Sequence, residues 1–175
     1  MNLNIEQFPK WCQMILRALR VDFRPGRQPS GWSVFAAAFV ALIGSLLADY
    51  LLVKAGTAIF PSTKGFVHFH FSDYSKLTII GVVIACCGWP LVTRLTSTPR
   101  GFFLRLAILV TLVLLVPDAW IWLHGEPGKA VFVLVWMHLA IAVITFNALV
   151  RIAPASRGRH AAVASKGSRG RAPEV

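Results

Sequence analysis

The sequence predicts an all-α integral membrane protein: a bundle of four membrane-spanning helices with an N-terminal amphipathic interfacial helix and a disordered basic C-terminal tail. Three observations support this class. Of the 175 residues, 56% are hydrophobic and 14% are charged, whereas a soluble domain carries about 25% charged residues. Four apolar runs are each long enough to cross a hydrocarbon core of about 30 Å, which takes about 20 helical residues. The eighteen Lys and Arg residues lie mainly between these runs, and with seven Asp and Glu residues they give the chain a net charge of +11.

The cytoplasmic segment, residues 1–30, contains a candidate amphipathic helix from Pro9 to Arg20. Polar residues recur on one face at steps of three and four, and apolar residues occupy the other: Lys10, Gln13, Arg17 and Arg20 against Trp11, Cys12, Ile15, Leu16 and Leu19. With a proline in the first turn, this pattern is typical of a helix in the headgroup layer, in contact with anionic lipids. The same stripe would also fit packing on a partner protein.

The transmembrane domain, residues 31–152, is expected to hold four spans at 32–53, 77–95, 102–123 and 130–152. Helices are expected because lipid offers no partner to an unpaired backbone amide. Runs such as IIGVVIACC are continuously apolar, whereas barrel strands alternate. The first run lies too far from the N-terminus, and lacks a small-residue cleavage site, to be a signal peptide.

The tail, residues 153–175, is rich in Ala, Ser, Gly and Arg, with no aromatic residue and one acid. This composition predicts disorder, because it offers no core. Its basic residues would face anionic lipid. Because no aromatic residue is interleaved for base stacking, no nucleic-acid partner is expected.

The basic residues also predict orientation. Fourteen of the eighteen precede the first span, lie at the second connection or follow the fourth span, whereas Lys54, Lys64, Lys76 and Lys129 lie on the other side. The positive-inside rule then places both termini in the cytoplasm and the first and third connections outside.

Three ionisable residues lie within the predicted spans: Asp49, Asp118 and His138. All three fall in the outer half, and such residues are costly in lipid and often functional. Thr111 shares a helical face with Asp118, and Thr145 shares one with His138. This intramembrane polar cluster predicts a proton- or cation-responsive site. The alternatives are a satisfied cluster that fixes helix packing, or acids that reach the outer interface.

Two further features bear on this cluster. Ala37, Ala41 and Ser45 precede Asp49 at four-residue steps, and small residues let helices approach closely. Asp49 is therefore expected to point into the bundle. Pro117 is expected to kink the third span just before the acid at 118, because it removes a backbone donor.

The first outer loop reads FVHFHFSDY, in which His68 and His70 alternate with phenylalanines. In an extended segment both histidines would face one side. With one or two of Asp73, His124 and Glu126, they would form a zinc or copper set. The alternative is an aromatic loop on the membrane surface with its histidines in water.

Other catalytic motifs are absent from the sequence: it contains no GxSxG, Walker loop, GxGxxG or HExxH. Cys86 and Cys87 are adjacent within the second span and are expected to pack beside Gly88 rather than form a redox couple. His138 is alone, so no pair of facing histidines suits a haem. We therefore expect a protein that is not an enzyme and holds no cofactor.

The run VLVWMHLAIAVITFNAL in the fourth span places a Met-His pair inside an Ala- and Val-rich helix. Over residues 132–151 and in its four-span layout, the chain resembles a family of small actinobacterial membrane proteins of unassigned activity. The histidine-bearing loop and the amphipathic helix depart from that family. The resemblance implies a bacterial cytoplasmic membrane and carries over no functional residue.

Three functions are consistent with these patterns. The first is a non-enzymatic accessory or stabilising subunit that docks on other membrane protein subunits, favoured by the four spans, the amphipathic helix and the basic tail. The second is a small proton-coupled transporter using the Asp/His cluster, which would need to pair with a second copy as a homo-oligomer. The third is a metal-dependent membrane enzyme using the loop histidines.

Overall fold

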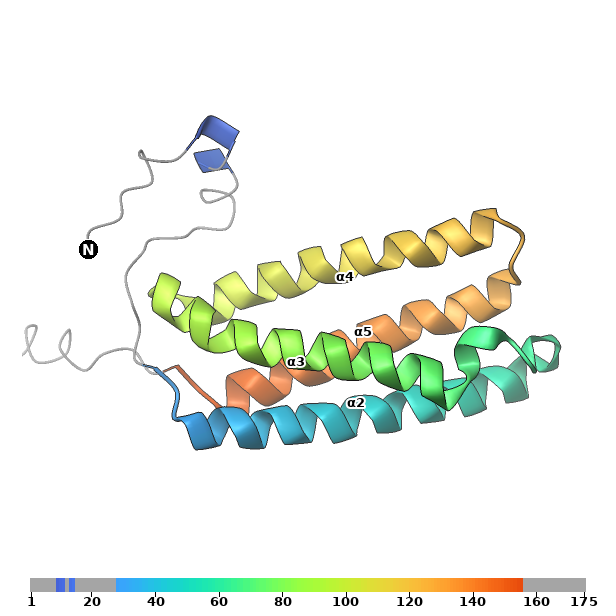
Figure 1. Ribbon diagram of the computed structural model, residues 1–175, viewed down its shortest axis with the longest axis horizontal. Coiled ribbons are helices and arrows are strands. Elements are labelled where there is room, and N and C mark those ends of the chain that lie inside the picture. Colours follow the sequence, from blue (N-terminus) through green and yellow to red (C-terminus); the bar gives the residue numbers. More distant parts are fainter. Residues whose placement is uncertain (1–8, 12, 15–27, 156–175) are drawn as a thin grey trace, which may run out of the picture.

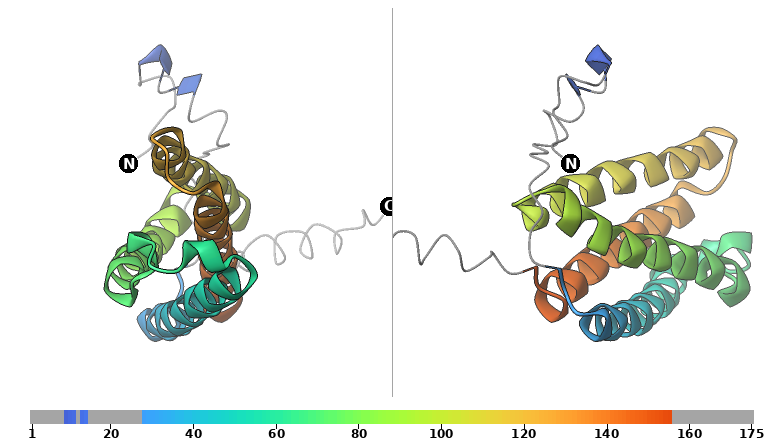
Figure 2. Two further views of the ribbon diagram at one scale, coloured as in Figure 1. Left: turned by 90° about the vertical axis from the view of Figure 1, so that its right-hand side faces the viewer. Right: turned by 60° about the vertical axis from the view of Figure 1, so that its left-hand side comes forward.

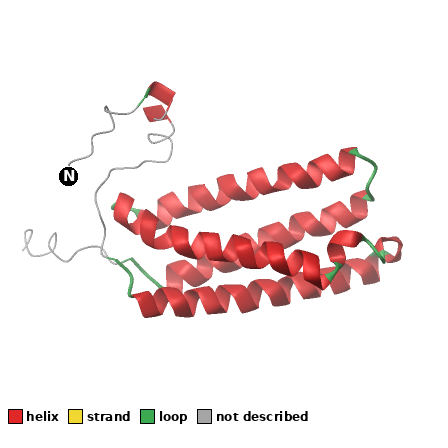
Figure 3. Cartoon of the chain, in the orientation of Figure 1, coloured by secondary structure: helices red, strands yellow, loops and turns green. Residues whose placement is uncertain are grey.

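The computed structural model describes residues 9–11, 13–14 and 28–155, and in this part of the chain all the regular structure is helical (Figures 1 and 3). The elements are α2 (Gly31–Ile59), η2 (Pro61–Thr63), η3 (Val67–Phe69), α3 (Phe71–Leu95), α4 (Pro99–Leu123) and α5 (Gly128–Ile152). The predicted all-α four-helix bundle is confirmed. All four α-helices are long and apolar enough to span a bilayer, so the chain is a multi-pass integral membrane protein.

The helices extend beyond the apolar runs from which they were predicted. Helix α2 continues to Ile59 rather than ending at Val53, and α3 begins at Phe71 rather than at Leu77. Hydropathy marks where polar side chains begin, whereas a helix ends where its backbone hydrogen bonds end. At the start of α2, the Ser30 hydroxyl caps the helix by accepting a hydrogen bond from the Ser33 amide at 3.1 Å.

Helix α5 is central in the packing: it contacts α2, α3 and α4, most extensively α2. Helix α4 lies on the side of the bundle away from α2 (Figure 2). Only 6% of the most apolar stretch of α4 is buried, against 22–33% in the other three helices. Most of the α4 surface is therefore available to lipid or to another protein.

The small-residue face predicted on α2 is confirmed. Ala37, Ala41, Ser45 and Asp49 are each 0% exposed, and Gly56 continues the same buried face. The absence of large side chains on this face explains why α2 packs so closely on α5.

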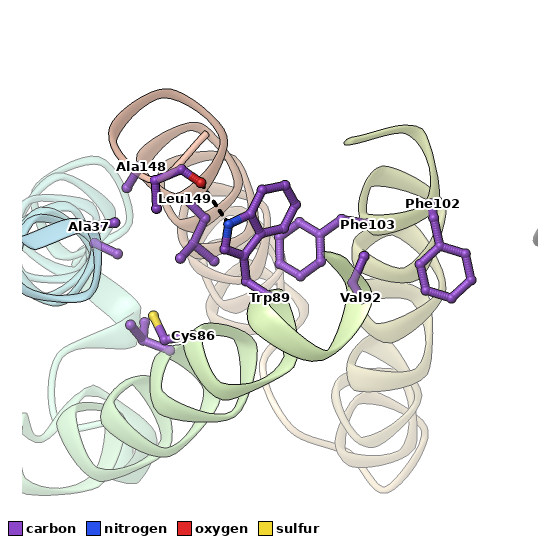
Figure 4. Packing of buried hydrophobic residues seen from close by; sticks show 11 residues of the cluster. Ala37, Cys86, Trp89, Val92, Phe102, Phe103, Ala148 and Leu149 are labelled. Atoms are coloured by element: carbon purple, nitrogen blue, oxygen red, sulfur yellow. Dashed lines mark hydrogen bonds between the residues drawn. The ribbon is translucent and has the colours of Figure 1, made fainter. Parts of the chain in front are cut away.

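A cluster of apolar residues fills the part of the bundle where α2 begins and α5 ends, and Figure 4 shows its packing. The Trp89 side chain is 1% exposed, and its Nε1–H donates to the carbonyl of Ala153 at 2.8 Å. The Phe103 ring meets it edge-on, with centroids 5.0 Å apart. Cys86 packs in this cluster as expected, whereas the neighbouring Cys87 is exposed, so only one of the two is a packing residue.

Some predictions fall outside the described residues. Residues 10–11 and 13–14 are helical, and the Gln13 amide donates to the Pro9 carbonyl at 3.0 Å. The rest of the amphipathic helix and residues 156–175 lie outside the described part. The interfacial helix, the disordered tail and the three-part domain division therefore remain predictions.

Candidate functional site

Each of the four long helices contributes one polar side chain to a group in the half of the bundle far from the termini. These are Asp49 from α2, Thr78 from α3, Asp118 from α4 and His138 from α5, and we call them the polar centre. The three ionisable members were predicted from the sequence. The structure pairs each acid with a polar residue of another helix.

The buried hydrogen bond between Asp49 and Thr78 joins α2 to α3. The Thr78 hydroxyl donates to Oδ2 of Asp49 over 2.6 Å. This length is typical of a hydroxyl bonded to a carboxylate. Asp49 is 0% exposed and Thr78 is 3% exposed. Asp49 therefore points into the bundle, as its small-residue face predicted, and does not reach the interface.

The second pair joins α4 to α5. Nδ1 of His138 lies 3.1 Å from Oδ2 of Asp118 and 3.0 Å from the carbonyl oxygen of Leu134. Nδ1 therefore lies within reach of two oxygens, one on its own helix and one on α4. The His138 side chain is 26% exposed and that of Asp118 is 9% exposed. The imidazole is thus tethered to its own helix while it faces the acid.

The polar centre contains two acids, Asp49 and Asp118, and one basic side chain, His138, which lies 3.1 Å from Asp118. If His138 carries a proton, it balances one of them. The second acid must then either carry a proton or accept hydrogen bonds from donors, because an unpaired charge in a low-dielectric interior is costly.

Several buried oxygens near this group have no hydrogen-bond partner among the described residues. They are Ser45 Oγ, Asp49 Oδ1, Asp118 Oδ2 and Thr145 Oγ1. Leaving such an atom unpaired costs roughly 1–3 kcal/mol. A bound water would provide a partner for such atoms, and a proton on either acid would remove the cost of its buried charge. The arrangement is therefore suited to taking up and releasing a proton.

Two threonines bear on the sequence expectation. Thr111 was expected to share a helical face with Asp118, and its hydroxyl donates to the Ala107 carbonyl of its own helix at 2.8 Å. Thr78 was missed. A threonine hydroxyl usually bonds to its own helix backbone, so nothing in the sequence distinguishes Thr78, which bonds across helices, from Thr111.

The structure does not bring the predicted metal ligands together. Among the described residues, no group of three or more His, Cys, Asp and Glu side chains could hold a metal ion. His68 lies in the short helix η3 rather than in an extended strand, so it does not alternate with His70 as expected. His124 caps the end of α4, where its Nδ1 lies 2.8 Å from the Trp120 carbonyl.

Comparisons with known proteins identify no relative: no family model, curated protein or solved structure matches the chain. The resemblance of residues 132–151 to an actinobacterial family therefore remains a prediction.

Proposed function

We propose that the chain is a non-enzymatic, proton-coupled transporter of a small solute, and that its proton binds at the polar centre. The observation that carries this proposal is the pairing of two buried acids, Asp49 and Asp118, with side chains from other helices inside the spans. Ionisable residues in this position are the usual components of proton relays.

The proposed coupling acts through helix α4. A charged Asp118–His138 pair attracts α4 to α5, and this attraction falls when the acid gains a proton. The most apolar stretch of α4 is only 6% buried, and in the polar centre this pair is the contact between α4 and α5. Protonation would then shift the balance between two positions of α4, as transport through an alternating site requires.

The test is proton flux in liposomes that contain the purified protein and the pH-sensitive dye pyranine. With an outward pH gradient and a panel of small solutes, one solute should change the rate of proton movement. Asp118→Asn should abolish that change, because the amide keeps the size of the side chain but cannot ionise. Thr111→Val is the matched control, since Thr111 lies on the same helix but bonds only to its own backbone. Equal proton movement in wild type and Asp118→Asn would contradict the proposal.

The exposure of α4 favours a second function, that of an accessory subunit. A helix whose most apolar stretch is only 6% buried leaves room for another membrane protein subunit. Purification in a mild detergent separates the two functions. Stoichiometric recovery with one defined complex, without solute-dependent proton flux, would favour the accessory role. In either case we place the chain in a bacterial cytoplasmic membrane with both termini inside.

A further inference from the structure

A cavity of about 450 Å³, partly open to its surroundings, is lined by the last turns of α2, the connection that contains η2 and η3, and the start of α3. These elements lie together at one end of the bundle (Figure 1). Binding sites for small organic molecules commonly measure about 300–1,000 Å³. The cavity is therefore large enough for such a molecule.

The charged residues that line the cavity are both positive. Lys54 and Lys64 line it, and no acid does. The Lys54 ammonium group lies 5.6 Å from the centroid of the Tyr50 ring, and no described carboxylate lies within ion-pair distance of either lysine. The nearby acid in the first turn of α3, Asp73, is outside the lining and accepts a hydrogen bond from the Ser72 hydroxyl at 3.4 Å.

The start of α3 adds to the positive side of the cavity. His70 and Phe71 line it, and His70 is the residue that precedes the helix without a side-chain hydrogen bond to its first amides. A helix N-terminus carries a partial positive charge, which favours a nearby anion. The lysines and the helix terminus therefore favour the same kind of ligand.

Aromatic rings make up most of the remaining wall. Phe66 and Phe69 meet edge-to-face with centroids 5.1 Å apart, and Phe71 meets Tyr74 in the same way at 5.4 Å. All four residues line the cavity. Such rings suit an apolar or aromatic ligand body.

We infer that this cavity binds an amphipathic organic anion, with its acidic group at Lys54 and Lys64 and its apolar body against the phenylalanine rings. Both the headgroup of an anionic lipid and a free aromatic acid have this chemistry. Tyr74 in the cavity wall lies about one helical turn before Thr78, which donates to Asp49, so the cavity adjoins the polar centre along α3. This inference does not rest on the proposed transport. Its test uses no proton gradient, so binding and transport can each succeed or fail separately.

The test measures binding of 6-fluoro-2-naphthoate and of its neutral amide by ¹⁹F NMR. The protein is held in nanodiscs of neutral phosphatidylcholine, and empty nanodiscs supply the background. Wild type should bind the acid more tightly than the amide. The Lys54→Gln/Lys64→Gln double variant should bind the acid about five- to tenfold more weakly, since each exposed charge contributes modestly. Lys76→Gln, which removes an exposed lysine of α3 outside the cavity, should change the affinity less than twofold.

Two outcomes would overturn the inference: equal affinity for the acid and the amide, or an unchanged affinity in the double variant. The Lys54→Arg/Lys64→Arg double variant is the control for misfolding. It retains both positive charges and should therefore retain binding. Native mass spectrometry after addition of phosphatidylglycerol then identifies the source of the anion. If wild type retains this lipid and the Gln double variant does not, the ligand of the cavity is a lipid headgroup. If both retain it equally, the ligand is a free acid.

Discussion

A carboxylate inside a hydrocarbon layer needs either hydrogen-bond donors or a proton of its own. The two oxygens of Asp49 differ in whether a donor reaches them. Oδ2 accepts the Thr78 hydroxyl at 2.6 Å, whereas Oδ1 has no partner among the described residues. The acid is thus held in position through one oxygen and left able to accept a proton on the other. Asp118 has a titratable partner instead, because its Oδ2 lies 3.1 Å from Nδ1 of His138.

The hydrogen bond from the Thr78 hydroxyl to Asp49 gives a prediction about this single hydroxyl group. Thr78→Val keeps the shape of the side chain but removes the donor, so the free energy of unfolding should fall by roughly 1–3 kcal/mol. Thr78→Ser restores the hydroxyl and should recover most of the loss. Thermal unfolding in detergent measures both. A Val variant as stable as wild type would mean that the Thr78 bond does not stabilise the buried acid.

The pair of Asp118 and His138 gives a second prediction. Asp118→Asn and His138→Gln should each lower the free energy of unfolding by roughly 1–3 kcal/mol, because each leaves a charged group without its partner. The double variant should lose less than the sum, since the second change removes the group left unpaired by the first. Strictly additive losses in detergent melts would show that the two side chains do not interact.

At the scale of helices, the spans were predictable and their limits and partners were not. The membrane fixes the length of an apolar run, so hydropathy alone revealed all four helices. It could not reveal that α3 begins at Phe71, because the first turn is polar and lies outside the apolar run. Four-residue spacing revealed the buried face of α2, but not that this face meets α5. Charge revealed Asp49, Asp118 and His138, whereas an uncharged partner such as Thr78 carried no comparable signal.

The close contact of α2 with α5 gives a prediction at this scale. A Cβ atom at Gly56 would lie 2.6 Å from Cγ2 of Val133, so Gly56→Ala should force the helices apart. Overpacking of this kind costs about 1–3 kcal/mol. Gly81→Ala in α3 is the matched control, because a Cβ there meets nothing within 4 Å. Detergent melts should show a loss for the first and none for the second.

Adding Val133→Ala to Gly56→Ala checks the cause of that loss. The second change removes the methyl groups that the new Cβ would meet. The double variant should therefore recover part of the stability lost in Gly56→Ala. A double variant less stable than both single variants would mean that the two residues act independently.

Over the whole molecule, the bundle has two unlike ends. The end near the termini is closed by the apolar cluster around Trp89. The opposite half holds the polar centre, and the end beyond it holds the lysine-lined cavity. The two ends of the bundle therefore present different chemistry to whatever lies beyond them. Which end faces which compartment then determines from which side a proton or an anion approaches the polar centre.

Orientation gives the last prediction, and the basic residues decide it. Lys54, Lys64, Lys76 and Lys129 all belong to the end that carries the cavity, whereas fourteen of the eighteen basic residues belong to the other side of the predicted topology. Positively charged loops are retained in the cytoplasm. Fusions of green fluorescent protein at Arg100 and after Val175 should therefore fluoresce, and a fusion of alkaline phosphatase at Lys64 should be active. The reverse pattern would turn the cavity to the cytoplasm, so that an anion would reach it only from inside the cell.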